Sequence, residues 1–109
     1  MMLRRIAWLL LLVTVWPAYA DDMDQQLTEA RAVFLRGVDG DRRAVRDATQ
    51  RFRVLSQSYP QEPVFVAYIG ACETLQGRDA PNYIEKRRMT EEGLSDVNRA
   101  LEMLSAGTD

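Results

Sequence analysis

The sequence lacks several residue types and motifs that commonly form catalytic sites. It has no histidine, so the commonest general base and the commonest metal ligand are both missing. It has no glycine-rich phosphate loop and no Gly-x-Ser-x-Gly elbow. Acidic pairs occur at Asp21-Asp22 and Glu91-Glu92, but adjacent residues on a helix do not converge on one point. We therefore expect no catalysis and no cofactor, with a small-ligand carrier or an enzyme as a remote alternative.

Cys72 is the only cysteine. A single cysteine excludes metal sites built from several thiolates, and it cannot form a disulfide within the chain. One interpretation is a small apolar residue buried on a helix. The other is a disulfide between two chains.

The first twenty residues have the layout of a secretory signal peptide. A short basic segment precedes the apolar run Ile6–Val15, which is interrupted only by Thr14, and Ala18-Tyr19-Ala20 then places small residues two apart. The run is too short for a comfortable span of a bilayer core about 30 Å thick. We predict a signal peptide over residues 1–20, cleaved after Ala20, and a periplasmic or secreted domain over residues 21–109. An uncleaved membrane anchor is the alternative.

The charge of the chain argues against two classes of partner. The net charge is −2, and removal of the signal peptide would take away two arginines. An acidic domain has no general attraction to nucleic acid or to anionic lipid. We expect no nucleic-acid partner and no membrane contact beyond export.

The remaining residues read as one small all-α domain. Apolar residues recur at spacings of three and four in four segments, and no stretch reads as a strand. Glycine and proline separate these segments. The expected helices cover residues 24–37, 42–58, 63–76 and 81–105, with Asp41 as the N-cap of the second. The third segment is apolar almost all round, so we expect it at the centre of the fold.

The second segment and the start of the third resemble a tetratricopeptide (TPR) repeat pair. The repeat is about 34 residues long and consists of two antiparallel helices. The second segment carries the small, aromatic, apolar and proline positions of a repeat's second helix: Ala48, Phe52, Leu55 and Pro60. The next repeat's positions hold Val66, Ile69 and Gly70. Two departures are valine in place of the usual tryptophan and Glu73 in place of an aromatic residue.

The last segment fits the resemblance only after a shift of eleven residues. The small, aromatic and small positions then become Gly93, Val97 and Ala100. Eleven residues are about three turns of helix, which preserves the facing of the apolar stripe. We therefore expect a lengthened helix in which residues 81–89 project beyond the body. Its second half carries an apolar stripe of Leu94, Val97, Leu101 and Leu104.

Two surfaces are candidates for protein binding. The resemblance implies a concave face made by the first helices of the repeats, with the small apolar residues Val33, Val64, Ala67 and Ala71. The expected projection supplies a second surface of aromatic, apolar and basic residues, namely Tyr83, Ile84, Arg87 and Arg88. The alternatives are core packing for the first set and a solvated helix end for the second.

The resemblance implies a protein–protein interaction module, an adaptor or assembly factor. A self-assembling structural subunit that pairs through the third and fourth segments is the alternative. The chain has about two repeats, and about three are normally needed for a stable array. We therefore expect a protein partner or a homo-oligomer.

Overall fold

The computed structural model describes residues 22–108, which form four helices and no strand. The first helix covers residues 22–38, and α2 (Arg42–Ser58), α3 (Pro63–Asp79) and α4 (Tyr83–Thr108) follow it. The predicted all-α class is confirmed. The predicted signal peptide lies outside the described residues.

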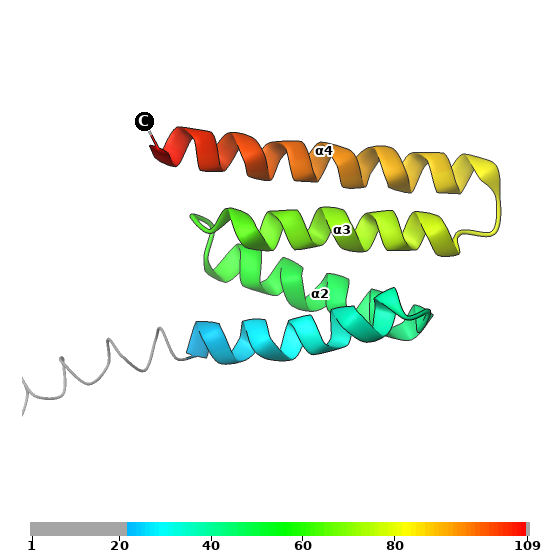
Figure 1. Cartoon of the computed structure of the whole chain (residues 1–109), viewed down its shortest axis with the longest axis horizontal. Helices are drawn as coiled ribbons and strands as arrows, with labels where there is room; N and C mark the ends of the chain where they lie inside the picture. Colours follow the sequence, from blue (N-terminus) through cyan, green and yellow to red (C-terminus); the bar gives the residue numbers. More distant parts are fainter. Residues whose placement is uncertain (1–21, 109) are drawn as a thin grey trace, which may run out of the picture.

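The helices lie side by side with α3 between α2 and α4 (Figure 1). α3 packs against both neighbours, whereas α2 and α4 do not pack against each other. The first helix lies along α2 and α3 on the far side from α4 (Figure 1). The third segment is therefore central, as its apolar composition predicts.

The sequence of α2 fixes both of its ends. Asp41 lies before the first turn, and its carboxylate accepts a hydrogen bond from the backbone N–H of Ala44 at 3.1 Å. At the other end the N–H of Tyr59 bonds to the carbonyl of Leu55 at 2.8 Å, and Pro60 follows in an exposed turn. The observed bounds match the predicted ones. The predicted stripe is buried: Val45, Ala48, Phe52, Leu55 and Tyr59.

Three aromatic rings join three helices in the core. Phe52 of α2 stacks on Tyr68 of α3, with ring centroids 4.3 Å apart and planes within 1°. Phe34 of the first helix meets both rings edge-on, at 6.4 Å from Phe52 and 5.3 Å from Tyr68. These rings tie the first helix to the rest of the fold.

α3 and α4 approach each other through glycines. A Cβ added to Gly70 would lie 2.6 Å from the carbonyl oxygen of Gly93, and one added to Gly93 would lie 2.6 Å from that of Gly70. The backbones can come this close only because both residues lack a side chain. Ala100 is buried and Val97 is half-buried in the same helix, so the predicted packing residues of α4 lie at or beside its contact with α3.

The end of α3 corrects one prediction. We expected the helix to stop at residue 76, before a glycine turn, but it continues to Asp79. A Cβ at Gly77 would lie 2.8 Å from the hydroxyl of Thr90 and 3.1 Å from the carbonyl of Lys86. Gly77 therefore permits a helix contact and does not end the helix. The start of α4 lies along this longer α3, so the prediction that residues 81–89 project beyond the body is wrong.

Candidate interaction surface

The structure corrects one predicted binding residue. Val33 is only 5% exposed and belongs to the core together with Ala30. The reason is the tight contact between the first helix and α2, where a Cβ at Gly37 would lie 2.8 Å from the side chain of Val45. Val33 lies one turn before Gly37 and is buried, so it does not line an open surface.

The other predicted residues of that set lie on one accessible face of α3. Val64 is 39% exposed, and Ala67 and Ala71 are half-buried. Their spacing of three and four places them on the same side of the helix.

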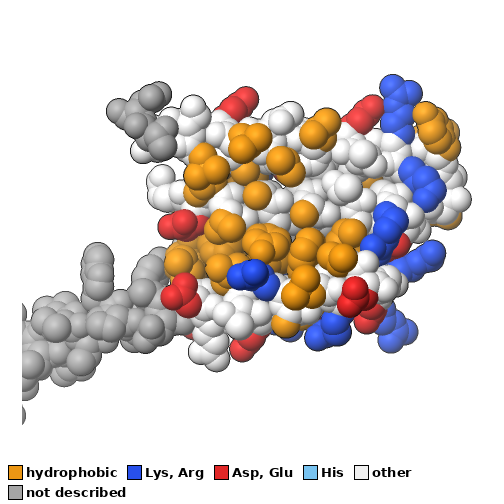
Figure 2. All heavy atoms as spheres, viewed as in Figure 1, with side chains coloured by type: hydrophobic (Ala, Val, Ile, Leu, Met, Phe, Trp, Pro, Cys, Tyr) orange, Lys and Arg blue, Asp and Glu red, His pale blue; other side chains and the backbone are white. Residues whose placement is uncertain are grey.

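An apolar groove runs between this face of α3 and the second half of α4. Its volume is about 410 Å³. Its lining, which we call the α3–α4 groove, is Glu62, Pro63, Val64, Ala67, Val97, Ala100, Leu101 and Leu104. Glu62 is the only ionisable residue in this lining. Figure 2 shows hydrophobic side chains over this face of the molecule, from α4 across α3 to the first helix.

Two large side chains of the groove, Leu101 and Leu104, belong to an apolar stripe whose exposure the sequence did not reveal. They are 58% and 53% exposed, and Leu94, which continues the stripe outside the groove, is 61% exposed. Their spacing predicts a common apolar face, but spacing alone does not show whether another helix covers it. Exposed leucines grouped in this way are characteristic of binding surfaces.

The second predicted surface lies at the other end of α4. Tyr83 and Ile84 are strongly exposed. Arg87 pairs with Glu91 at 3.0 Å, and Arg88 pairs with Glu85 at 2.7 Å and with Glu92 at 3.3 Å. Such exposed pairs within one helix contribute little to stability. About 20 residues of helix, roughly 30 Å, separate Tyr83 from Leu104, so the structure does not join this surface to the groove.

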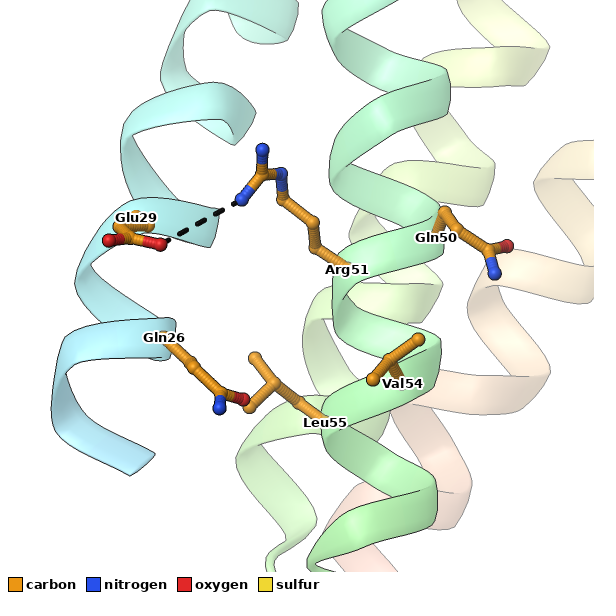
Figure 3. Close-up of a pocket in the computed structure, with 6 residues that line it drawn as sticks. All are labelled: Gln26, Glu29, Gln50, Arg51, Val54 and Leu55. Atoms are coloured by element: carbon orange, nitrogen blue, oxygen red, sulfur yellow. Dashed lines mark ion pairs between the residues drawn. The ribbon is translucent and has the colours of Figure 1, made fainter. Parts of the chain in front are cut away.

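A separate hollow of about 310 Å³ lies between the first helix and α2 (Figure 3). Gln26 and Glu29 enter it from the first helix, and Arg51 reaches from α2 to within 4.0 Å of Glu29. Arg51 is also bonded to Asp47 at 3.0 Å. The polar groups of the hollow are thus partly exposed and held in ion pairs.

The sequence analysis missed a buried acid. Glu73 of α3 is only 4% exposed. Burial raises the pKa of Glu73 to about 8, with further contributions from Asp96 and Glu92 of α4, while Arg53 opposes the shift. The available signal was that Glu73 occupies a place where the repeat pattern expects an aromatic core residue.

Cys72 lies beside a small polar network between α2 and α3. It is fully buried, and burial raises the pKa of its thiol above the usual value. The hydroxyl of Thr49 donates to the carbonyl of Val45 at 2.7 Å and accepts from the amide of Gln76 at 3.0 Å. A thiol in this position is neutral and shielded, which disfavours a disulfide between chains.

Other kinds of site are not seen in the part of the chain that the structure describes. Within residues 22–108 no group of histidine, cysteine or acidic side chains could hold a metal ion. None of the described helices is long and apolar enough to span a bilayer. No protein-family model matches the chain, and neither a curated protein nor a solved structure is significantly similar to it.

Proposed function

We propose that this chain is an exported, TPR-like interaction module that binds another protein through the α3–α4 groove. The observation that carries the proposal is the groove itself, with exposed leucines on one side and small residues at its base. In the TPR-like interpretation, α2 and α4 are the second helices of two repeats and α3 is the first helix of the second.

The shape and chemistry of the groove favour an apolar helix as the ligand. The small side chains of Ala67 and Ala100 leave room at its base, and the larger side chains of Leu101 and Leu104 line it from α4. Helix-in-groove recognition uses apolar anchors at spacings of three, four and seven. In a repeat array a further helix packs against the last helix pair in the same way, so a partner helix would extend the stack.

Site-specific photo-crosslinking in the host cell tests the proposal. A photoreactive residue at Ala67 should crosslink to one protein, through a segment with apolar residues at helical spacing. The same residue at Gln50, which is exposed on α2, is the position control.

A matched pair of leucine variants gives the decisive comparison. Leu101 and Leu35 are both 58% exposed, but only Leu101 lines the groove. Leu101→Asp should reduce the Ala67 crosslink at least tenfold, because it places a charge in an apolar site. Leu35→Asp should leave it unchanged. Equal yields in the two variants would refute binding through the groove.

The exposed leucines of α4 also favour a second candidate, self-assembly. Leu94, Val97, Leu101 and Leu104 alternate at spacings of three and four, the pattern of a coiled-coil seam. Two copies could pair along this stripe. The solution mass of the chain separates this candidate from the first.

The proposed location has its own test. If the chain is exported and cleaved, protein purified from the periplasm or medium should begin at Asp21. A cytoplasmic protein that retains residues 1–20 would contradict the export proposal.

A further inference from the structure

Lys and Arg side chains gather at one end of the molecule. Figure 2 shows them over the turn between the first helix and α2 and over the connection from α3 to α4. A hollow of about 410 Å³ lies there, and we call it the arginine hollow. None of its lining residues lines the α3–α4 groove. The lining is Arg42, Val45 and Arg46 of α2, Gln76 and Asp79 of α3, and Pro81 of the connection.

Two lining arginines carry charge that the fold itself does not pair. Arg42 and Arg46 are four residues apart, so they extend from the same side of α2, and both are exposed. Within residues 22–108, neither guanidinium group forms an ion pair or a hydrogen bond. A guanidinium group stays charged in proteins and offers five N–H donors. These donors are therefore available to an anionic ligand.

The one acid in the lining, Asp79, is already paired. Arg78 donates to both of its carboxylate oxygens, at 2.9 and 3.1 Å. These hydrogen bonds lower the pKa of Asp79, and the charges of Arg42 and Lys86 add to the shift, so the carboxylate stays ionised. Because Asp79 is matched by Arg78, the charges of Arg42, Arg46 and Lys86 leave an excess of positive charge around the arginine hollow.

Contacts between helices hold the walls of the hollow in place. Lys86 of α4 donates to the carbonyl of Arg78 at 2.9 Å. Arg78 in turn donates to the carbonyls of Gly37 and Val38 in the first helix, at 2.8 Å each. The ends of three helices are thus connected around this hollow. A site that is fixed before binding loses less conformational freedom when a ligand arrives.

Separate carboxylates suit this hollow better than an anionic lipid surface does. Guanidinium groups bind carboxylates in a forked geometry, as Arg78 and Asp79 do at this hollow. A lipid surface is broad and would also meet Asp39 and Asp41, which are exposed at the adjacent turn. A short peptide segment can place its carboxylates on the two free guanidinium groups and avoid these acids.

We propose that the arginine hollow binds an acidic segment of another protein, with carboxylate side chains of that segment paired to Arg42 and Arg46. One turn of α2 separates the two arginines by about 6 Å along the helix. In an extended segment, side chains two residues apart are about 6.6 Å apart and lie on one side, so alternate acidic residues match this spacing. The proposal does not rest on the α3–α4 groove.

A hexaglutamate peptide, blocked at both ends, is the probe for residues 21–109. At low salt it should shift the NMR signals of residues 42–46 and 76–81, and added salt should weaken its binding. Arg42→Gln combined with Arg46→Gln should weaken binding at least about tenfold, because two charge-assisted contacts are lost. Arg31→Gln combined with Arg43→Gln removes the same charge from exposed arginines outside the hollow. This control pair should weaken binding about twofold at most, through long-range charge alone.

Equal weakening in the two double variants would overturn the proposal, because binding would then depend only on overall charge. Binding of inorganic phosphate or of phosphatidylglycerol vesicles, under conditions where hexaglutamate does not bind, would overturn it as well. If the glutamine variant does not fold, lysine at positions 42 and 46 keeps the charge but loses the forked donors, so binding should still weaken. An unchanged affinity in that variant would contradict the pairing. Leu101→Asp, towards the other end of α4, should leave hexaglutamate binding unchanged, so this proposal and the proposed function fail separately.

Discussion

The contact between Gly70 and Gly93 shows how a single residue type sets the spacing of two helices. Each backbone occupies the space that a side chain on the other would need. Thr74 adds to the crowding, because a Cβ at Gly93 would lie 2.5 Å from its hydroxyl oxygen. The hydroxyl itself donates to the carbonyl of Gly70 at 3.0 Å. An added carbon would therefore clash with backbone atoms as well as with a side chain. Moving a side chain alone cannot relieve such a clash.

Gly70→Ala should destabilise the protein. Alanine favours a helix over glycine by up to about 1 kcal/mol, but the added carbon would lie 2.6 Å from the backbone of Gly93. Overpacking of this kind typically costs about 1–3 kcal/mol in the free energy of unfolding, which urea denaturation measures. Gly107→Ala is the control, because nothing lies within 4 Å of its added carbon. A Gly70→Ala variant as stable as the wild type would show that the helices can move apart freely.

At the scale of residues, the sequence predicted the features that depend only on neighbouring residues in the chain. Asp41 caps α2 because a short acceptor before a helix satisfies its own nearby N–H groups. The burial of Glu73 could not be predicted, because it depends on how other helices pack against α3. The prediction that Val33 lines a binding surface was wrong for a related reason. An apolar residue can line a surface or fill a core, and only the packing of the neighbouring helix decides between them.

At the scale of helices, Arg78 connects the ends of two elements that are distant in sequence. Its guanidinium donates to the carbonyls of Gly37 and Val38 at 2.8 Å each. These carbonyls belong to the last turn of the first helix, where carbonyl groups lack the usual hydrogen-bond donor four residues further on. Arg78 also pairs with Asp79 at 2.9 Å. The end of α3 is thus tied to the turn that precedes α2.

Arg78→Ala should loosen that turn selectively. Hydrogen exchange of residues 37–44 should accelerate, while exchange in the second half of α4 should not change. Arg78→Lys should restore only part of the protection, because an ammonium group cannot reproduce the forked geometry. Arg46→Ala, which removes an exposed arginine of α2, is the control. Uniform acceleration along the chain would instead indicate a general loss of stability.

Helix boundaries were predictable where a cap or proline sets them and less so elsewhere. α2 has the predicted bounds because Asp41 and Pro60 flank it. α3 runs past its predicted end because Gly77, which by itself suggests a stop, lies against α4. The same contact explains why the start of α4 does not project.

At the scale of the whole molecule, α3 is the only one of the three labelled helices that contacts both others. The central place of α3 follows from its composition, since a helix without a polar face must be covered on several sides. The apolar stripe of α4 was equally visible in the sequence. That it stays uncovered could not be predicted, because periodicity identifies a face but not its neighbour.

The solution mass of residues 21–109, measured by light scattering over a wide concentration range, tests the central claim that the α3–α4 groove is open to another protein. We predict a folded monomer at every concentration, with or without reductant, since Cys72 is buried. Leu101→Asp should leave this mass unchanged. A wild-type dimer that Leu101→Asp converts to a monomer would contradict the account, because the groove would then be filled by a second copy of the chain.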